Sequence, residues 1–395
     1  MNTMAQRILT THVGSLVRPD DLIALLKARE EGVQVDRSAF DACVQRSVSE
    51  VVYKQSELGI DIVNDGEYGK SISWSRYVVE RLSGFEQRDR KPGDTSMALA
   101  TFGQDRRKFA DFYKDYDPKQ GLTRMTGWAV TEPITYQGQT AIQADIDNLK
   151  AAIGDVAVED VFMPAVAPAS VVPDRLDEYY ANDDDYVFAV ADALHEEYKA
   201  IVDAGFILQI DDAYLASYYD VIVPPGTLAD YRAWAEVRVE ALNRALKGIP
   251  EERTRYHVCW GSWNGPHVYD VELKNIIDLV LQVRVGGYSL EMANPRHEHE
   301  WQVFKQVKLP PGRNVLPGVI SHSTNVVEHP ELVAERITKL ANVIGRENVI
   351  ACTDCGFAQG PFVQRVHPTI MWAKLDSLVT GARIASRDLW GKKAR

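Results

Sequence analysis

Eight short apolar runs recur along the chain, and a longer segment with the spacing of an amphipathic helix follows each of them. This alternation is typical of repeated βα units, whose strands form a parallel sheet. The runs cover residues 8–15, 61–67, 160–166, 206–212, 254–260, 288–292, 314–320 and 348–353, and the segments 184–204, 227–247 and 330–344 are examples of the predicted helices. Eight such units predict an α/β fold of the closed (β/α)8, or TIM barrel, type. An open doubly wound sheet is the alternative.

One segment interrupts the alternation after the second predicted strand. Residues from about 71 to 149 are rich in Arg, Lys, Asp and Gly and contain one strand-like run, at 125–136. The 395 residues suffice for one large barrel or for two ordinary domains. We interpret the segment as an insertion into a single barrel domain that spans residues 1–395. Its very polar stretch 102–121 is interpreted as a solvated loop, with a lid or an oligomer contact as alternatives.

The charge and the cysteines restrict the partners of the chain. A formal net charge of -12 argues against nucleic acid and against an anionic membrane surface, because both require a basic face. A small molecule is therefore the expected partner. No long apolar run and no N-terminal leader pattern are evident, so we expect a cytoplasmic protein. Four cysteines are too few for a disulfide framework and favour metal binding or catalysis.

Polar residues gather at the carboxyl ends of the predicted strands, where a barrel places its active site. His257 and Cys259 lie two positions apart on one predicted strand, so their side chains point to the same face. Glu291 ends the next strand, and Cys355 ends the last one. One imidazole, one carboxylate and two thiolates suit zinc better than magnesium or calcium. Taken singly, each of these residues could equally be part of a packed core.

These motifs resemble a known family. HVC at 257–259, LEMA at 290–293, the histidine of ISHSTN at 320–325 and TDCG at 353–356 are similar to the catalytic C-terminal barrel of the cobalamin-independent methionine synthases. THVGS, NDGE and QIDD match strand ends that bind substrate in that family, so the resemblance covers nearly the whole chain. It implies a zinc ion held by His257, Cys259, Glu291 and Cys355.

The resemblance also implies a reaction. In the family, homocysteine binds zinc as a thiolate and attacks the methyl group of a folate, because the metal lowers the pKa of the thiol. His322 matches the general acid that protonates the leaving group. Ser15, Glu67 and Asp211 match the positions that hold the amino and carboxylate groups of the amino-acid thiol. The sequence therefore predicts a zinc-dependent methyltransferase that acts on a small thiol and an alkyl donor, but it predicts neither the donor nor the oligomeric state.

Two other functions remain open. Relatives of similar length include epoxyalkane:coenzyme M transferases, which open an epoxide with a zinc-bound thiolate. Coenzyme M carries a sulfonate and no ammonium, so the retained Glu67 and Asp211 favour an amino-acid thiol instead. A non-catalytic zinc-binding barrel would have a closed site and no adjacent substrate pocket. The available cations for a sulfonate are Arg18, Lys70, Arg76 and Arg296.

Overall fold

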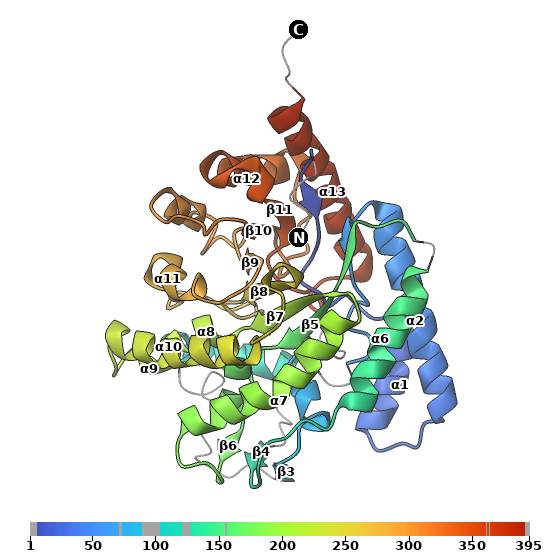
Figure 1. The fold of residues 1–395 in the computed structure, drawn as a ribbon, viewed down its shortest axis with the longest axis vertical. Helices are drawn as coiled ribbons and strands as arrows, with labels where there is room; N and C mark the ends of the chain where they lie inside the picture. Colours follow the sequence, from blue (N-terminus) through green and yellow to red (C-terminus); the bar gives the residue numbers. More distant parts are fainter. Residues whose placement is uncertain are drawn as a thin grey trace.

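The fold is a nearly closed barrel of eight parallel strands in a computed structural model, which describes residues 6–70, 73–88, 103–120, 127–154, 156–360, 362 and 364–391. The strands lie at the centre of the molecule and helices surround them (Figure 1). Around the barrel the order is β1 (Leu9–Thr10), β11 (Ile350–Thr353), β10 (Asn314–Ile320), β9 (Gly287–Leu290), β8 (Thr254–Val258), β7 (Ile207–Asp212), β5 (Asp160–Val166) and β2 (Ile62–Val63). The Asp61 N–H donates to the Thr10 carbonyl at 3.1 Å and links the two end strands. The predicted barrel is confirmed, and the open doubly wound sheet is wrong.

Each predicted strand overlaps an observed one, but their bounds differ. β5 and β10 match the predicted runs residue for residue, because both are continuous buried apolar segments. β1 and β2 keep only two residues each. Gly14 and Gly66 adopt φ values of 131° and 68°, and Glu67 adopts 61°. These conformations prevent β1 and β2 from continuing as strands and turn the loop after each of them toward the barrel axis.

The outer layer consists of helices that connect successive strands. Local signals fix where several of them begin. α12 and α13 each start with proline directly after a capping histidine, and α10 has a capping box formed by Thr227 and Asp230. The described helices of this layer are α1 (Asp20–Glu30), α2 (Arg37–Leu58), α6 (Gln139–Ile153), α7 (Asp183–Asp203), α8 (Tyr214–Ser217), α9 (Tyr219–Ile222), α10 (Leu228–Ala245), α11 (Ile277–Val280), α12 (Pro330–Ile344) and α13 (Pro368–Trp390).

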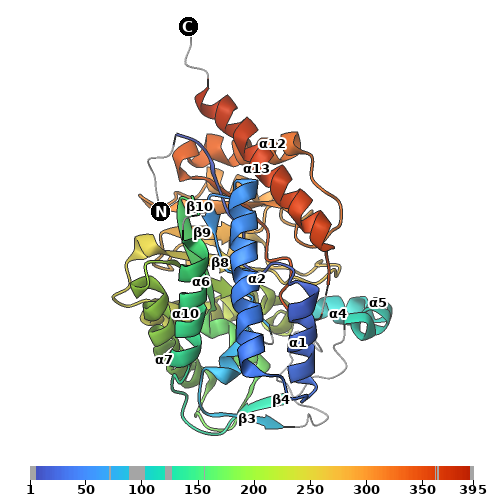
Figure 2. The ribbon, with the colours of Figure 1, turned by 90° about the vertical axis from the view of Figure 1, so that its right-hand side faces the viewer.

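The segment between β2 and α6 adds structure outside the barrel. Its β3 (Phe85–Arg88) pairs antiparallel with β4 (Gly127–Val130), and β4 pairs with β6 (Leu176–Asp177). β3 and β4 lie at one end of the molecule, and α4 (Gln104–Lys108) and α5 (Ala110–Tyr116) lie at its side (Figure 2). α6 packs between α2 and α7 as part of the barrel layer. Positions 71–72, 89–102 and 121–126 of the predicted insertion lie outside the described residues.

The expected solvated loop at 102–121 is wrong over its described part, because α4 and α5 occupy it. Phe109, Tyr113 and Tyr116 are spaced four and three residues apart and give α5 an aromatic face. Tyr113 is buried, and its hydroxyl accepts a hydrogen bond from Trp263 Nε1 at 3.0 Å. The aromatic face therefore packs on the loop that follows β8.

The barrel interior is filled toward the ends where the strands begin. Leu9, Ile62, Phe162, Ile207 and Ile350 belong to one buried cluster, which continues along the barrel to Cys259 and Cys355. A TIM barrel binds its ligands at the end where the strands finish. Within the part of the chain that the structure describes, no helix has the length and apolar character that crossing a membrane requires.

Candidate functional site

The candidate site lies at the end of the barrel where the strands finish. His257 is on β8, and Cys259 is the first residue after it. Glu291 directly follows β9, while His322 and Cys355 lie two residues beyond β10 and β11. These four strands are consecutive neighbours in the barrel. The parallel sheet therefore brings together buried side chains that are far apart in the sequence.

Three predicted ligands converge on one point. The ligand atoms of His257, Cys259 and Cys355 all lie within 4.8 Å of one another. The two Sγ atoms are 3.6 Å apart, and both cysteines are free. His257 Nδ1 lies 3.1 Å from Ser289 Oγ, whereas its Nε2 is buried and has no hydrogen-bond partner. The imidazole is thus fixed on one side, and its other nitrogen is available to a ligand.

The two thiols differ in how readily they ionise. The hydrogen bond from Cys259 lowers the pKa of Cys355 well below that of an ordinary thiol, even though burial opposes the ionisation. The same hydrogen bond raises the pKa of Cys259, and burial raises it further. One sulfur is therefore prepared to be a thiolate, which is the form that binds metals.

Glu291 belongs to a second group of buried ligands, separate from the triad. Its carboxylate forms a separate cluster with His322 and Asp354, whose ligand atoms also lie within 4.8 Å of one another. Glu291 Oε1 accepts the Trp260 N–H at 2.9 Å, while Oε2 has no partner. Asp354 Oδ1 accepts the two N–H groups that follow Glu291, each at 2.8 Å, and so holds this turn. The role of Glu291 as fourth ligand stays a prediction.

The donor atoms fit a metal ion. A buried polar atom without a partner is costly, so the free His257 Nε2 and Glu291 Oε2 require a ligand or a proton. Two sulfurs in contact without a disulfide are equally typical of a metal site. His322 has no partner on either ring nitrogen, and burial lowers its pKa.

The predicted thiol-binding residues come together beside this centre. Ser15 contacts the loop after β11: its carbonyl accepts the Phe357 N–H at 2.8 Å. Burial raises the pKa of Asp211 to about 7; the charge of Glu67 raises it as well, while His257 lowers it. These influences place the two carboxylates near each other and near the triad.

Lys70 changes the charge of this region. Its Nζ lies 2.9 Å from Glu67 Oε2, and both side chains are buried. Asp211 Oδ1 accepts a hydrogen bond from Gln209 Nε2 at 2.7 Å, and within the described part of the chain Asp211 forms no ion pair with a lysine or arginine. Glu67 is thus neutralised within the protein, and Asp211 is the carboxylate left for a ligand.

The other cations expected for a sulfonate lie in different surroundings. Arg18 is buried beside the Glu67–Lys70 turn, where its Nη2 donates to the Glu67 carbonyl at 2.6 Å. Arg296 is exposed and donates to the Val268 carbonyl at 3.1 Å. Arg76 begins a short 3-10 helix and is half-buried. Lys70 therefore pairs with the side chain of a predicted thiol-binding residue, and Arg18 contacts the backbone of the same residue.

Sequence reasoning missed several side chains around the sulfurs. Ser262 Oγ donates to Cys355 Sγ at 3.0 Å, and Gln359 Nε2 lies 3.7 Å from the same atom. Arg365 Nη1 donates in turn to Gln359 Oε1. Ser262 follows Cys259 closely enough for its position to suggest a role. Arg365, ten positions after Cys355, carried no such signal.

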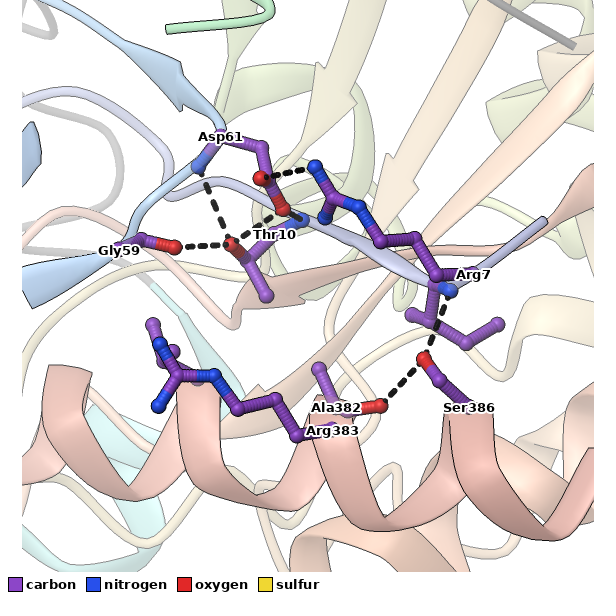
Figure 3. A pocket seen from close by; sticks show the side chains of 9 residues that line it. Arg7, Thr10, Gly59, Asp61, Ala382, Arg383 and Ser386 are labelled. Carbon is purple, nitrogen blue, oxygen red and sulfur yellow. Dashed lines mark hydrogen bonds and ion pairs between the residues drawn. The ribbon is translucent and has the colours of Figure 1, made fainter. Parts of the chain in front are cut away.

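A pocket at the other end of the barrel is a different kind of site. Figure 3 shows Arg7, Thr10 and Asp61 bound to one another where β1 and β2 begin, with Arg383 of α13 beside them. Asp61 accepts hydrogen bonds from the Thr10 N–H at 2.8 Å and lies 2.7 Å from Arg7 Nη2. These contacts fasten the strands to each other and leave the converging ligands at the opposite end.

Comparisons with known proteins agree with this location. Residues 170–366 match the family described as cobalamin-independent synthase, catalytic domain, and this range includes the triad, Glu291 and His322. A methionine synthase from Thermococcus kodakarensis is 23% identical over 96% of this chain and 94% of its own length. A 2-hydroxypropyl-CoM lyase from Xanthobacter autotrophicus is 23% identical over 90% of this chain and 89% of its own.

A solved structure has the same fold. The B12-independent methionine synthase from Shewanella sp. W3-18-1, in complex with selenomethionine, superimposes with a TM-score of 0.73 at 18% identity. The superposition covers 98% of this chain and 99% of that one. The barrel and its added segment thus have a counterpart over the full length.

Proposed function

Because the chain belongs to the cobalamin-independent methionine synthase family, we propose that it is a zinc-dependent methyltransferase whose acceptor is a small thiol, homocysteine. The observation that carries the proposal is the convergence of two thiols and a free imidazole nitrogen beside two buried carboxylates. A nucleophile-activating centre and a recognition site for an amino acid are thus adjacent.

We assign the metal to His257, Cys259 and Cys355, with the free oxygen of Glu291 as the fourth ligand. Two thiolates, one imidazole and one carboxylate form a donor set that zinc accepts and that alkaline-earth ions do not. When bound, zinc would lower the pKa of the substrate thiol, so that the thiolate is present at neutral pH. The burial of all four side chains keeps competing water out.

The amino-acid part of the thiol is assigned to Asp211, Glu67 and Ser15. Lys70 balances Glu67, so the ammonium of the substrate would balance Asp211 and leave the site without a net charge from these groups. A charge-assisted hydrogen bond to a buried carboxylate is among the stronger polar contacts in proteins. Ser15 lies in the loop after β1 and contacts the loop after β11. We assign it to the substrate carboxylate.

His322 is assigned the proton transfer. Both of its ring nitrogens are free of protein partners, and burial lowers its pKa. The charges of Cys355 and Glu291 favour the protonated ring against burial, and an imidazole in that form can protonate a leaving group as the carbon–heteroatom bond breaks. The ligand atoms of His322, Glu291 and Asp354 all lie within 4.8 Å of one another.

Epoxide opening by a coenzyme M thiolate is the second candidate function. Lys70 and Arg18 favour it, because both are buried cations next to a predicted thiol-binding residue. The similarity to a 2-hydroxypropyl-CoM lyase favours it as well. Asp211 disfavours it, since a free carboxylate would repel a sulfonate. A purely zinc-binding barrel would have no use for the unpartnered His322.

The test is a direct assay of the zinc-loaded protein. We expect methyl transfer from 5-methyltetrahydrofolate or a sulfonium donor to homocysteine, detected as methionine, and binding of coenzyme M that is weaker than that of homocysteine. Tighter binding of coenzyme M together with consumption of epoxypropane would replace the proposal by the second function. A protein that binds zinc but neither thiol would contradict both.

A further inference from the structure

Arg365 lies in the segment between β11 and α13, on the side of the site that contains His322. Its Nη1 donates to Gln359 Oε1, and Gln359 Nε2 reaches the Gly356 carbonyl and lies 3.7 Å from Cys355 Sγ. The guanidinium is therefore joined to a metal-binding sulfur through a single side chain.

The guanidinium is partly buried and incompletely paired. Its Nε is shielded from solvent and has no hydrogen-bond partner. Burial lowers the pKa of Arg365, whereas the nearby Tyr116 hydroxyl and the thiols of Cys355 and Cys259 raise it. Within the described residues, Arg365 forms no ion pair with a carboxylate. A buried cation without an anionic partner is costly, and a ligand can relieve that cost.

The added segment outside the barrel helps to position this cation. Tyr116 ends α5, and its hydroxyl accepts the Asn264 N–H at 2.9 Å in the loop after β8. Tyr116 also stacks on Phe112, with ring centroids 5.1 Å apart. α5 thus extends over the loop that follows Cys259 and places an aromatic hydroxyl beside Arg365. The barrel alone would not supply this wall.

We propose that Arg365, positioned by Gln359 and Tyr116, forms an oxyanion-binding subsite for one of the two substrates. Only the identity of the substrates rests on the proposed function. A planar guanidinium with a free N–H fits a carboxylate, sulfonate or phosphate better than any neutral group. Either substrate can supply the oxyanion. In the thiol, the anionic group would lie a few bonds from the sulfur. In the methyl donor, it would belong to the part of the molecule that leaves near His322.

Binding measurements with matched ligand pairs test the subsite. The first pair is homocysteine and homocysteine methyl ester, which differ in the charge of one carboxylate. The second pair is 5-methyltetrahydrofolate and the diester of its glutamate part, which differ in the charge of the carboxylates. Calorimetric affinities are measured for the zinc-loaded wild type, Arg365→Gln, Arg365→Lys and the control Arg383→Gln, which changes an exposed arginine at the opposite end of the barrel.

We expect Arg365→Gln to weaken the oxyanion-bearing member of one pair by roughly tenfold or more and its matched partner by less than about twofold. Arg365→Lys should restore part of the loss, and Arg383→Gln should change neither pair. The pair that responds identifies whether the thiol or the donor supplies the oxyanion.

Equal losses for both members of each pair would indicate a structural role and overturn the subsite, and so would unchanged affinities. Because these measurements need no turnover, a protein that fails to transfer methyl groups but discriminates the thiol pair through Arg365 would refute the proposed function and leave the subsite standing.

Discussion

The two ends of the barrel treat charged and polar groups in opposite ways. Where the strands begin, carboxylates are paired with arginines: Arg7 with Asp61, and Arg253 with Asp160, both at 2.7 Å. Where the strands finish, His257, Glu291, Asp354 and Arg365 each keep a buried nitrogen or oxygen without a partner.

This difference separates stability from function. A buried polar atom that is left unpaired opposes folding, so a protein retains it where a ligand completes the contact. The beginning of the barrel follows the rule for a structural end, in which the charges of Arg7, Asp61, Arg253 and Asp160 are paired within the chain. The other end follows the rule for a binding site.

The proposed metal ligands give the largest expected effect. Cys355→Ser and Cys259→Ser should each lower both zinc content and activity by more than the ~10–100-fold typical of changes to outer partners of a metal site. We expect about one zinc per chain in the wild type, measured by elemental analysis. Cys43→Ser in α2 is the control, because that buried thiol is remote from the triad. Full zinc occupancy in both triad variants would refute the assignment.

How much of this could be predicted from the sequence depends on how local the signal is. β5 and β10 were predicted residue for residue because each is a continuous apolar run. His257 and Cys259 were predicted as neighbours because alternate residues of a strand share a face. The ligand atom of Cys355 lies within 4.8 Å of theirs, although it comes from another strand.

The remaining features depend on contacts between distant segments. The Lys70–Glu67 ion pair forms because a positive φ at Glu67 turns the chain back on itself, and Arg365 reaches the sulfurs only through Gln359. The helical α5 was missed although Phe109, Tyr113 and Tyr116 carry helical spacing, because the high charge of the segment outweighed that short pattern.

Asp211 provides a sharper test of the unpaired end. If it binds the ammonium of homocysteine, Asp211→Asn should weaken that ligand by roughly 2–4 kcal/mol. The affinity for coenzyme M should stay the same or improve, since a repelling charge is removed. Calorimetry with both thiols measures the two signs, and the zinc content of the variant should equal that of the wild type. Parallel losses for both thiols would instead indicate damage to the barrel mouth.

Two histidines at the end where the strands finish test whether paired groups stabilise the fold and unpaired groups serve function. His297 contacts Glu300 Oε2 at 2.8 Å and Asp270 Oδ2 at 3.0 Å; although burial opposes it, these carboxylates raise its pKa to about 10. The stabilisation that protonated His297 gives to the folded state should be complete below the pKa of histidine in the unfolded chain, near 6.5. This stabilisation should disappear as the pH rises through about 10, the pKa of His297 in the folded state.

Denaturation in urea at pH 6 and pH 10 measures how the contribution of His297 to the unfolding free energy depends on pH. His297→Gln should lower the unfolding free energy by about 3 kcal/mol at pH 6 and by much less at pH 10, without loss of zinc. His322→Gln should do the reverse: turnover falls while stability stays near that of the wild type. A pH-independent deficit in His297→Gln would contradict the paired assignment.

The smallest effect is expected at the paired end. Arg253 forms two hydrogen bonds to Asp160, at 2.7 and 3.1 Å, and a third to the Gly205 carbonyl at 2.6 Å, which ties the start of β8 to β5 and β7. Both side chains of the ion pair are partly exposed, so solvent screens the attraction and Arg253→Met should cost only about 1 kcal/mol of unfolding free energy. Salt should reduce the difference in unfolding free energy between the wild type and the variant, because screening weakens an ion pair that the variant lacks. Zinc content and thiol affinity should remain at wild-type values, since the filled barrel interior separates this pair from the sulfurs. A loss of zinc in Arg253→Met would show that the two ends are coupled, and the division between a structural and a functional end would then be wrong.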